Sequence, residues 1–152
     1  MSQAEVVGPL DKAVGYALKR AATALRTAMD AALRPLDLTV SQYSCLEVLS
    51  QQPGLSNAEL ARAVFVTRQS MNLVLRGLQD RGLVTRPATA AHGRALPTEL
   101  TATGRTQLRA ASTAVRAVER QMLASLTGGE QDRLLRDLVA CTEALADADE
   151  PL

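Results

Sequence analysis

The sequence predicts a mainly α-helical fold that includes one small β-hairpin, and three observations favour this class. Apolar residues recur at intervals of three and four along most of the 152 residues, which is the spacing of helices with one buried face. That period is lost between residues 83 and 101, where two short extended runs flank a polar loop. Aromatic residues make up only 2% of the chain, so small aliphatic side chains must fill the core, which favours closely packed helices.

The first predicted helix covers residues 11–34 and ends at Arg34-Pro35, because a residue before proline avoids the helical conformation. Its single apolar stripe consists of Val14, Leu18, Ala21, Leu25, Ala28 and Ala32. The second helix lies within residues 38–54, where Thr39 and Gln42 have the spacing of a capping box. Pro53-Gly54 ends that run.

The third helix is short, lies within residues 55–65, and begins with a second capping box, formed by Ser56 and Glu59. A fourth helix over residues 67–81 starts at Thr67, a residue type that commonly caps helices. It stops at Gly82, since glycine is favoured just past a helix C-terminus. Its apolar positions have helical spacing and predict one buried face, made of Met71, Val74, Leu75 and Leu78.

The extended runs 83–87 and 95–101 predict a hairpin with residues 88–94 as its exposed tip. Pro97 cannot donate a backbone hydrogen bond, so its strand is expected at an edge. Two longer helices are predicted next, over residues 102–126 and 130–147. Thr127 and Glu130 have the spacing of a third capping box.

Positive charge is concentrated in the middle of the chain. The net charge is +1, but residues 54–105 hold seven arginines against three acidic residues, and arginine suits phosphates and guanine edges. Cys45 and Cys141 form no C-x-x-C pair and the single histidine is His92, so neither a metal site nor a cofactor is expected. No catalytic set of carboxylates, Ser/His/Asp or Cys/His residues is present, which argues against an enzyme. No signal peptide and no membrane-spanning run of ~20 apolar residues is found, so a cytoplasmic location is expected.

Polar residues occupy the face of helix 67–81 that lies opposite its apolar stripe. Gln and Asn side chains pair with adenine and Arg with guanine, and the free N–H groups at a helix start suit a phosphate. A short helix, a tight turn and such a second helix form a helix-turn-helix pattern, and the hairpin after it has the place of a wing. The predicted DNA-binding residues are Thr67, Arg68, Gln69, Ser70, Asn72 and Arg76, with Arg86 at the base of the wing and Arg94 near its tip. Leu73 shares this face and either touches a thymine methyl group or faces a partner helix.

These motifs resemble the MarR (multiple antibiotic resistance regulator) family of bacterial winged helix-turn-helix transcription factors. The similarity runs from Leu60-Ala61 through Val66-Thr67, Met71, Leu75, Leu78 and Gly82-Leu83-Val84 to Arg86. The family closes its wing with L-T-x-x-G, which here is Leu100-Thr101-Ala102-Thr103-Gly104. One departure lies at the wing tip, where the family often has Asp-Arg-Arg and this chain has His92-Gly93-Arg94.

The resemblance implies a homodimer that represses transcription from a near-palindromic double-stranded DNA operator and is released by a small ligand. Residues 1–37 and 102–152 are then the dimerisation helices, and residues 38–101 form the winged helix-turn-helix lobe. The apolar stripes on helices 11–34, 102–126 and 130–147 agree, because one winged helix does not need to bury all of them. For the implied pocket, which takes an aromatic or carboxylate ligand, the candidates are Tyr16, Arg20, Tyr43 and Arg109.

Alternatives stay open for three features. The chain is either such a regulator or a protein-interaction module that kept the scaffold without specific DNA binding. The resemblance implies that an oxidant-sensing cysteine would lie in the first helix, as in some members of the family, whereas Cys45 falls in the second, which favours a buried structural thiol over an oxidant sensor. His92 is either a loop residue without a role or a group whose protonation strengthens DNA binding at mildly acidic pH.

Overall fold

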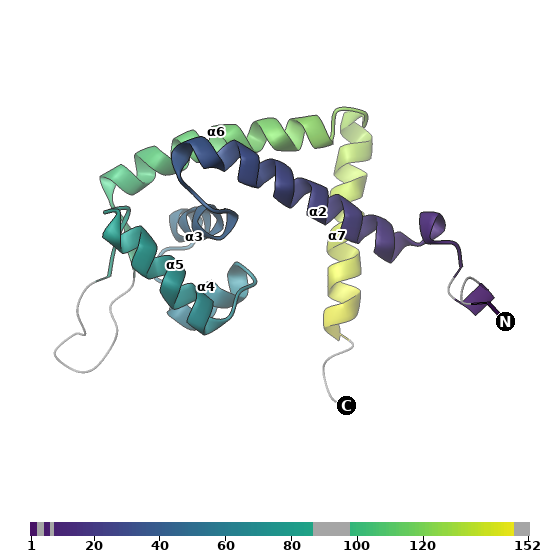
Figure 1. The fold of residues 1–152 in the computed structure, drawn as a ribbon, viewed down its shortest axis with the longest axis horizontal. Coiled ribbons are helices and arrows are strands. Elements are labelled where there is room, and N and C mark those ends of the chain that lie inside the picture. Colours follow the sequence, from purple (N-terminus) through teal and green to yellow (C-terminus); the bar gives the residue numbers. More distant parts are fainter. Residues whose placement is uncertain (3–4, 7, 87–97, 148–152) are drawn as a thin grey trace. The chain divides into compact units, whose positions relative to one another are not determined.

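The computed structural model describes residues 1–2, 5–6, 8–86 and 98–147, which divide into two compact units, residues 1–118 and 119–152 (Figure 1). The first unit holds, in order, the 3-10 helix η1 (Leu10–Lys12), α2 (Val14–Leu33), the 3-10 helix η2 (Arg34–Leu36), α3 (Val40–Gln51), α4 (Asn57–Ala63), α5 (Arg68–Asp80), and strands β1 (Val84–Thr85) and β2 (Glu99–Leu100). Helix α6 (Ala102–Met122) leads into the second unit, which holds α7 (Gly128–Asp147).

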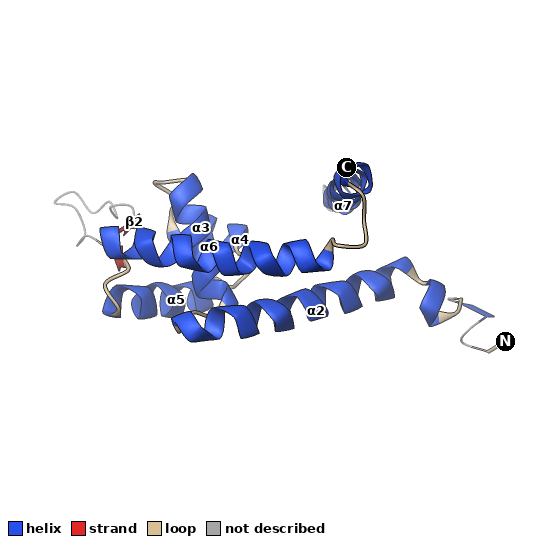
Figure 2. Ribbon diagram, turned by 90° about the horizontal axis from the view of Figure 1, so that it is seen from above, coloured by secondary structure: helices blue, strands red, loops and turns tan. Residues whose placement is uncertain are grey.

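Helices make up most of the described chain, and the only strands in that part are the short antiparallel pair (Figure 2). The predicted class and order of elements are therefore confirmed. The division into dimerisation helices and a lobe at residues 38–101 stays a prediction, because only a second chain can test it. None of the described helices is long and apolar enough to cross a bilayer.

All three predicted capping boxes are formed. The Thr39 hydroxyl accepts from the Gln42 N–H and the Gln42 side chain accepts from the Thr39 N–H, both at 3.1 Å, at the start of α3. The same reciprocal pair opens α4 at Ser56, and hydrogen bonds from Ser56 lower the pKa of the Glu59 carboxyl. The pair of Thr127 and Glu130 opens α7. Each box satisfies backbone donors that a helix start leaves unpaired.

Three helical segments end with the same backbone motif, in which one residue adopts a left-handed conformation. At the end of α5 this residue is Gly82, with φ 70°; the Leu83 N–H donates to the Leu78 carbonyl at 3.0 Å. Asp37, with φ 53°, does the same after η2, and Phe65, with φ 60°, after α4. Glycine adopts this conformation without steric cost, whereas a bulky side chain does so at a cost of about 1–2 kcal/mol.

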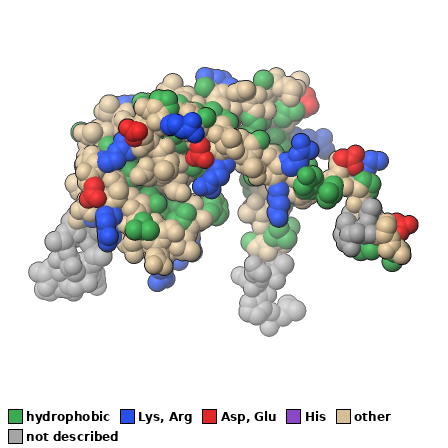
Figure 3. All heavy atoms as spheres, in the orientation of Figure 1, with side chains coloured by type: hydrophobic (Ala, Val, Ile, Leu, Met, Phe, Trp, Pro, Cys, Tyr) green, Lys and Arg blue, Asp and Glu red, His purple; other side chains and the backbone are tan. Residues whose placement is uncertain are grey.

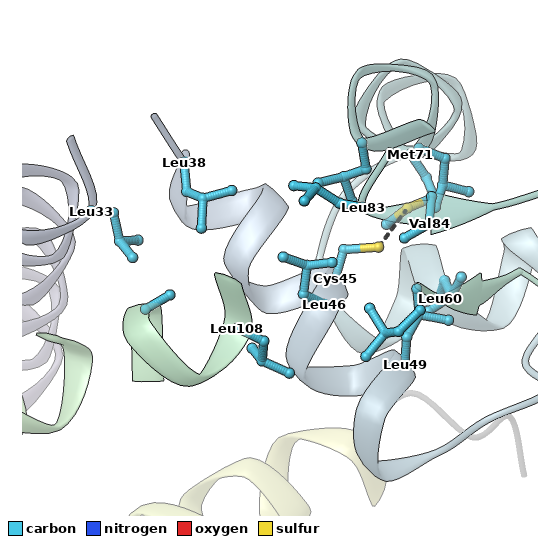
Figure 4. Packing of buried hydrophobic residues seen from close by; sticks show 14 of the residues in the cluster. Leu33, Leu38, Cys45, Leu46, Leu49, Leu60, Met71, Leu83, Val84 and Leu108 are labelled. Carbon is cyan, nitrogen blue, oxygen red and sulfur yellow. Dashed lines mark hydrogen bonds between the residues drawn. The ribbon is translucent and has the colours of Figure 1, made fainter. Parts of the chain in front are cut away.

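The core lies in the first unit and gathers side chains from α3, α4, α5, the hairpin and the first part of α6 (Figure 4). Its fully buried side chains include Leu33, Cys45, Leu46, Leu60, Met71, Leu75 and Leu78. The Cys45 thiol points at the Met71 sulfur, 4.0 Å away. Burying a leucine contributes about 1.5–3 kcal/mol, so this cluster fixes how α5 sits on α3.

The hairpin and the start of α6 are joined by the L-T-x-x-G segment. Val84 pairs with Leu100 and Thr85 with Glu99. The Thr101 hydroxyl donates to the Gly82 carbonyl at 2.7 Å and accepts from the Gly104 N–H at 2.9 Å, while the Thr101 N–H donates to the Leu83 carbonyl at 3.1 Å. The predicted tip 88–94 and Pro97 lie outside the described residues.

The predicted bounds of two long helices are wrong. The helix predicted from residue 11 is interrupted at Ala13, which is extended, so α2 begins at Val14. The predicted end of the helix over residues 102–126 is wrong as well. Apolar spacing continues to Leu126, but α6 ends at Met122 and residues 123–126 form a turn. The side chain of Gln131 holds that turn by donating to the carbonyls of Leu123 and Leu126 at 3.3 and 3.1 Å. Hydrophobic spacing cannot mark this end, because Leu126 keeps the period while the backbone leaves the helix.

Apolar stripes on two helices are left uncovered in the single chain. Leu33 is the buried residue of α2, and hydrophobic side chains are open to solvent along this helix (Figure 3). No described residue of α7 is buried. Its large exposed apolar side chains are Leu134, Leu135, Leu138, Val139 and Leu145.

Candidate nucleic-acid interface

Helices α4 and α5 pack against each other and form the helix-turn-helix, with residues 64–67 as the turn. The Val66 N–H donates to the Ala61 carbonyl at 3.0 Å and closes the end of α4. Thr67 then caps α5, because its hydroxyl accepts from the Ser70 N–H at 3.0 Å. Both sides of the turn are hydrogen-bonded, so the direction in which α5 leaves α4 is fixed.

Helix α5 separates its side chains into two opposite faces. Met71, Leu75 and Leu78 are 0% exposed, and Val74 packs against the same core. The predicted DNA-binding side chains on this helix all lie exposed: Arg68, Gln69, Ser70, Asn72 and Arg76, preceded by the exposed cap Thr67. The geometry that the sequence predicts is found, whereas a DNA-binding role for each residue stays a prediction.

The arginines of this region fall into two groups. Arg68 and Arg76 form no ion pair or hydrogen bond with any described residue, so their guanidinium groups are available to a ligand. Arg81, at the end of α5, instead donates to the carbonyls of Asp37 and Leu36 at 2.6 and 3.2 Å. Arg81 therefore supports the fold. The number of arginines in this part of the sequence thus overstates how many are free to contact DNA.

Asn57 is a contributor that sequence reasoning missed. Its side-chain amide, on the first turn of α4, donates to Asn72 Oδ1 at 2.9 Å. This contact holds the Asn72 side chain in place and leaves its NH2 group free to donate. The two residues are 15 positions apart, so only the packing of α4 on α5 brings them together. Ser70 is held similarly, by a 3.0 Å hydrogen bond that the Thr67 hydroxyl donates to the Ser70 oxygen.

The wing is described only at its base. Arg86 directly follows β1 and is half-buried. Arg94 and His92, on which the predictions for the wing tip depend, lie outside the described residues.

The predicted ligand residues are only partly brought together. Tyr16 and Arg20 lie on one face of α2, with the guanidinium carbon 6.0 Å from the ring centre, and they line an open hollow of about 700 Å³. Tyr43 is half-buried on α3 against the core, and exposed Arg109 on α6 donates to the Thr106 hydroxyl at 3.4 Å. Neither is among the described residues that line that hollow.

A second hollow, of about 380 Å³, lies between α2 and α3. It combines the cation of Arg26 with the apolar side chains of Leu25, Met29 and Val40. Sequence reasoning missed this group, because the α2 stripe by itself does not reveal that Val40 of α3 lines the same hollow as Met29.

Cys45 is a buried thiol, as the sequence favours. It is 0% exposed, and burial raises its pKa to about 12. A thiol reacts as its thiolate, so the raised pKa makes this residue inert in the folded chain at neutral pH. Cys141, on α7, is exposed.

Comparison with known proteins places the chain in a family. The sequence profile of the MarR family matches residues 36–95. The chain is 49% identical over 128 residues to the HTH-type transcriptional repressor Rv2887 of Mycobacterium tuberculosis, which covers 84% of this chain and 92% of that protein. Its fold matches Rv2887 in complex with DNA with a TM-score of 0.72 at 46% identity, over 84% of this chain and 96% of that one. For Rv2887 in complex with salicylic acid the TM-score is 0.71 at 48% identity, over 84% and 95% of the two chains. This chain belongs to the MarR family of winged helix-turn-helix transcription regulators.

Proposed function

We propose that this protein is a homodimeric, sequence-specific DNA-binding repressor whose helix α5 enters the major groove of a near-palindromic operator. The observation that carries the proposal is the exposed polar face of α5, where Arg68 and Arg76 have no partner among the described residues. The repressor Rv2887, known in complex with DNA, is a close relative and supports the same reading. That relative is a transcriptional regulator and not an enzyme, and we assign no catalytic role here. A target in chromosomal DNA implies a cytoplasmic location.

Each exposed residue has a role that fits its chemistry. Gln69, Asn72 and Arg76 are spaced along the groove-facing side and read base edges, Arg76 by a bidentate contact with guanine. Arg68 and the Ser70 hydroxyl lie at the positive end of the helix and bind phosphate. Arg86 contacts phosphate from the base of the wing, and Arg94, outside the described residues, enters the adjacent minor groove.

The uncovered leucines of α7 support the homodimer. A chain that stays monomeric seldom leaves so many large apolar side chains on one helix in water, and a second copy supplies an equally apolar surface. In such a dimer, residues 1–37 and 102–152 form the interface. Two α5 helices about one DNA turn (~34 Å) apart then read the two halves of the operator.

An aromatic carboxylate is the proposed ligand class. Rv2887 is known in complex with salicylic acid, and each hollow on α2 offers an arginine beside apolar or aromatic side chains. The hollow with Arg26 and Met29 is lined by α2 and by Val40 of α3, so it offers a flat ring an apolar surface beside a cation. Ligand binding acts by favouring a dimer whose α5 spacing no longer matches the groove. Calorimetry with salicylate tests the two sites, since Arg20→Ala and Arg26→Ala remove one cation each.

The test of DNA binding starts with selection of an operator from a random DNA pool, followed by fluorescence anisotropy. Arg76→Ala removes one bidentate base contact, worth about 1–3 kcal/mol, from each half-site of the dimer, so it should raise Kd for the selected operator by at least roughly 30-fold. Arg116→Ala removes the same charge from an exposed position of α6 away from this face; provided that its assembly mass equals that of wild type, it should leave Kd unchanged. Equal affinity of wild type, Arg68→Ala and Arg76→Ala would rule out the proposed interface.

A salt titration separates this function from a protein-interaction module. Contacts with phosphate release counterions, so DNA binding weakens steeply as salt rises. An apolar protein interface hardly responds to salt. Because each lost phosphate contact lowers the slope by about one, Arg68→Ala should flatten the salt dependence, and an unchanged slope would remove its phosphate role.

A further inference from the structure

One apolar side chain interrupts the polar face of α5. Leu73 is 65% exposed, although the leucines and the methionine on the other face of the same helix are 0% exposed. Gln69 lies four positions before it and Arg76 three positions after it, and side chains at these spacings lie next to each other on a helix. Leu73 therefore sits in the middle of the surface that the proposed function places in the major groove.

The surroundings of Leu73 decide between the two occupants that suit an apolar side chain. A partner protein would require a wider apolar patch, but the neighbours of Leu73 on this face are Gln69, Asn72 and Arg76, all exposed and polar. Asp80, two turns further on, is polar as well. Phe65, the other large exposed apolar residue of the motif, lies in the turn before α5 and outside its helical face. The positive charge of Arg76 beside Leu73 instead suits a polyanion such as DNA.

The major groove presents a single apolar group among its polar base edges, the C5 methyl group of thymine. We propose that Leu73 is a specificity-determining residue that packs on a thymine methyl group in each half of the operator. This inference rests on the proposed function and adds to it the identity of one base. Cytosine lacks the methyl group and presents an amino donor that a leucine cannot pair with, so this position selects thymine over cytosine.

The size of the effect follows from one buried methyl group. Removing it from water contributes about fourfold in Kd for each half-site. A dimer that uses both half-sites multiplies the two factors, so an operator that lacks both methyl groups should bind roughly 15-fold more weakly.

Deoxyuridine provides the test, because it keeps the base pair of thymine and lacks only the methyl group. Each symmetric pair of thymines in the selected operator is replaced by deoxyuridine, and Kd is measured by anisotropy for wild type and Leu73→Ala. We expect one symmetric pair at which deoxyuridine lowers the affinity of wild type about 15-fold. At that pair Leu73→Ala should bind the thymine and the deoxyuridine operators equally. Phe65→Ala, which also removes an exposed apolar side chain, should keep the full loss seen with wild type.

Three results would overturn the inference. The first is that deoxyuridine weakens operator binding by wild type at no position. The second is that it weakens binding by Leu73→Ala as much as binding by wild type. The third is that Leu73→Ala changes the assembly mass while it still loses affinity for the deoxyuridine operator. That result would assign Leu73 to a protein contact. In all these cases wild type still selects an operator, so the proposed function survives, whereas failure to select any operator removes both.

Discussion

Replacing Gly104 by alanine tests the close approach between the first turn of α6 and the end of the α5 segment. A Cβ atom built on Gly104 would lie 2.0 Å from the carbonyl oxygen of Leu83 and 3.0 Å from its carbonyl carbon. Non-bonded heavy atoms prefer a separation of about 3.5–4.0 Å. The Leu83 oxygen also accepts the Thr101 N–H at 3.1 Å, so it cannot turn away without losing that hydrogen bond.

Two effects of opposite sign compete in this variant. Alanine is favoured over glycine inside a helix by about 1 kcal/mol. Against this, relieving the clash shifts the start of α6, which weakens a hydrogen bond worth about 1 kcal/mol and disturbs the packing of buried Leu108 and Ala111. Overpacking of this kind costs about 1–3 kcal/mol. The steric effect is therefore larger, and we expect Gly104→Ala to lose about 2 kcal/mol of unfolding free energy.

Gly77→Ala is the matched control, in the interior of α5. There the added Cβ would lie 3.4 Å from the end of the Gln42 side chain, an ordinary van der Waals contact, so the helix preference should prevail and stability should rise by about 0.5–1 kcal/mol. Urea unfolding followed by circular dichroism measures both, at one protein concentration because dimerisation contributes to stability. Helix propensity alone predicts a gain for both variants. A Gly104→Ala protein at least as stable as wild type would refute the steric argument.

Three further predictions concern the turn, an arginine and a thiol. Phe65→Gly should raise the unfolding free energy by about 1 kcal/mol, because glycine adopts a φ of 60° without cost. Phe65→Ala keeps the backbone strain, so urea unfolding should show no such gain for that variant. Arg81→Met should lose about 1 kcal/mol with its hydrogen bonds to the residue 36 and 37 carbonyls, whereas Arg68→Met should unfold like wild type. At pH 8, a thiol reagent should leave Cys45 unlabelled in the native protein, since the folded Cys45 pKa of about 12 keeps that thiol protonated. In urea, where its pKa returns to the ordinary value, Cys45 should react; mass spectrometry that finds native Cys45 labelled would contradict its burial.

Features that depend on neighbouring residues could be predicted from the sequence. Each capping box spans four positions, so Thr39, Ser56 and Thr127 mark helix starts without knowledge of the fold. The buried side of α5 follows from the spacing of Met71, Leu75 and Leu78 alone. The left-handed turn at Gly82 was predictable for the same reason, but the one at Phe65 was not, because no local pattern favours phenylalanine there.

Features that depend on tertiary packing could not be predicted in this way. The contact of Asn57 with Asn72 needs the crossing of α4 and α5, and the hydrogen bond of Arg81 to the Leu36 carbonyl joins residues 45 positions apart. Counting arginines therefore predicts a basic region but cannot reveal that Arg81 supports the fold. Only the structure separates the arginine that holds the fold from those left open to a ligand.

The hydrogen bonds at Leu36 join the elements that carry the proposed ligand and DNA sites, which a ligand-responsive repressor must couple. Its carbonyl accepts from Arg81, at the end of α5, and from the side chain of Gln107 on α6 at 2.8 Å. Leu36 itself lies in η2, which directly follows α2, the helix that lines both hollows proposed for the ligand. A displacement of α2 must therefore carry the end of α5 with it or break these bonds, each worth about 1 kcal/mol. Because the coupling between two sites is typically 1–3 kcal/mol, contacts of this size are sufficient to link occupancy of a hollow on α2 to the position of the recognition helix.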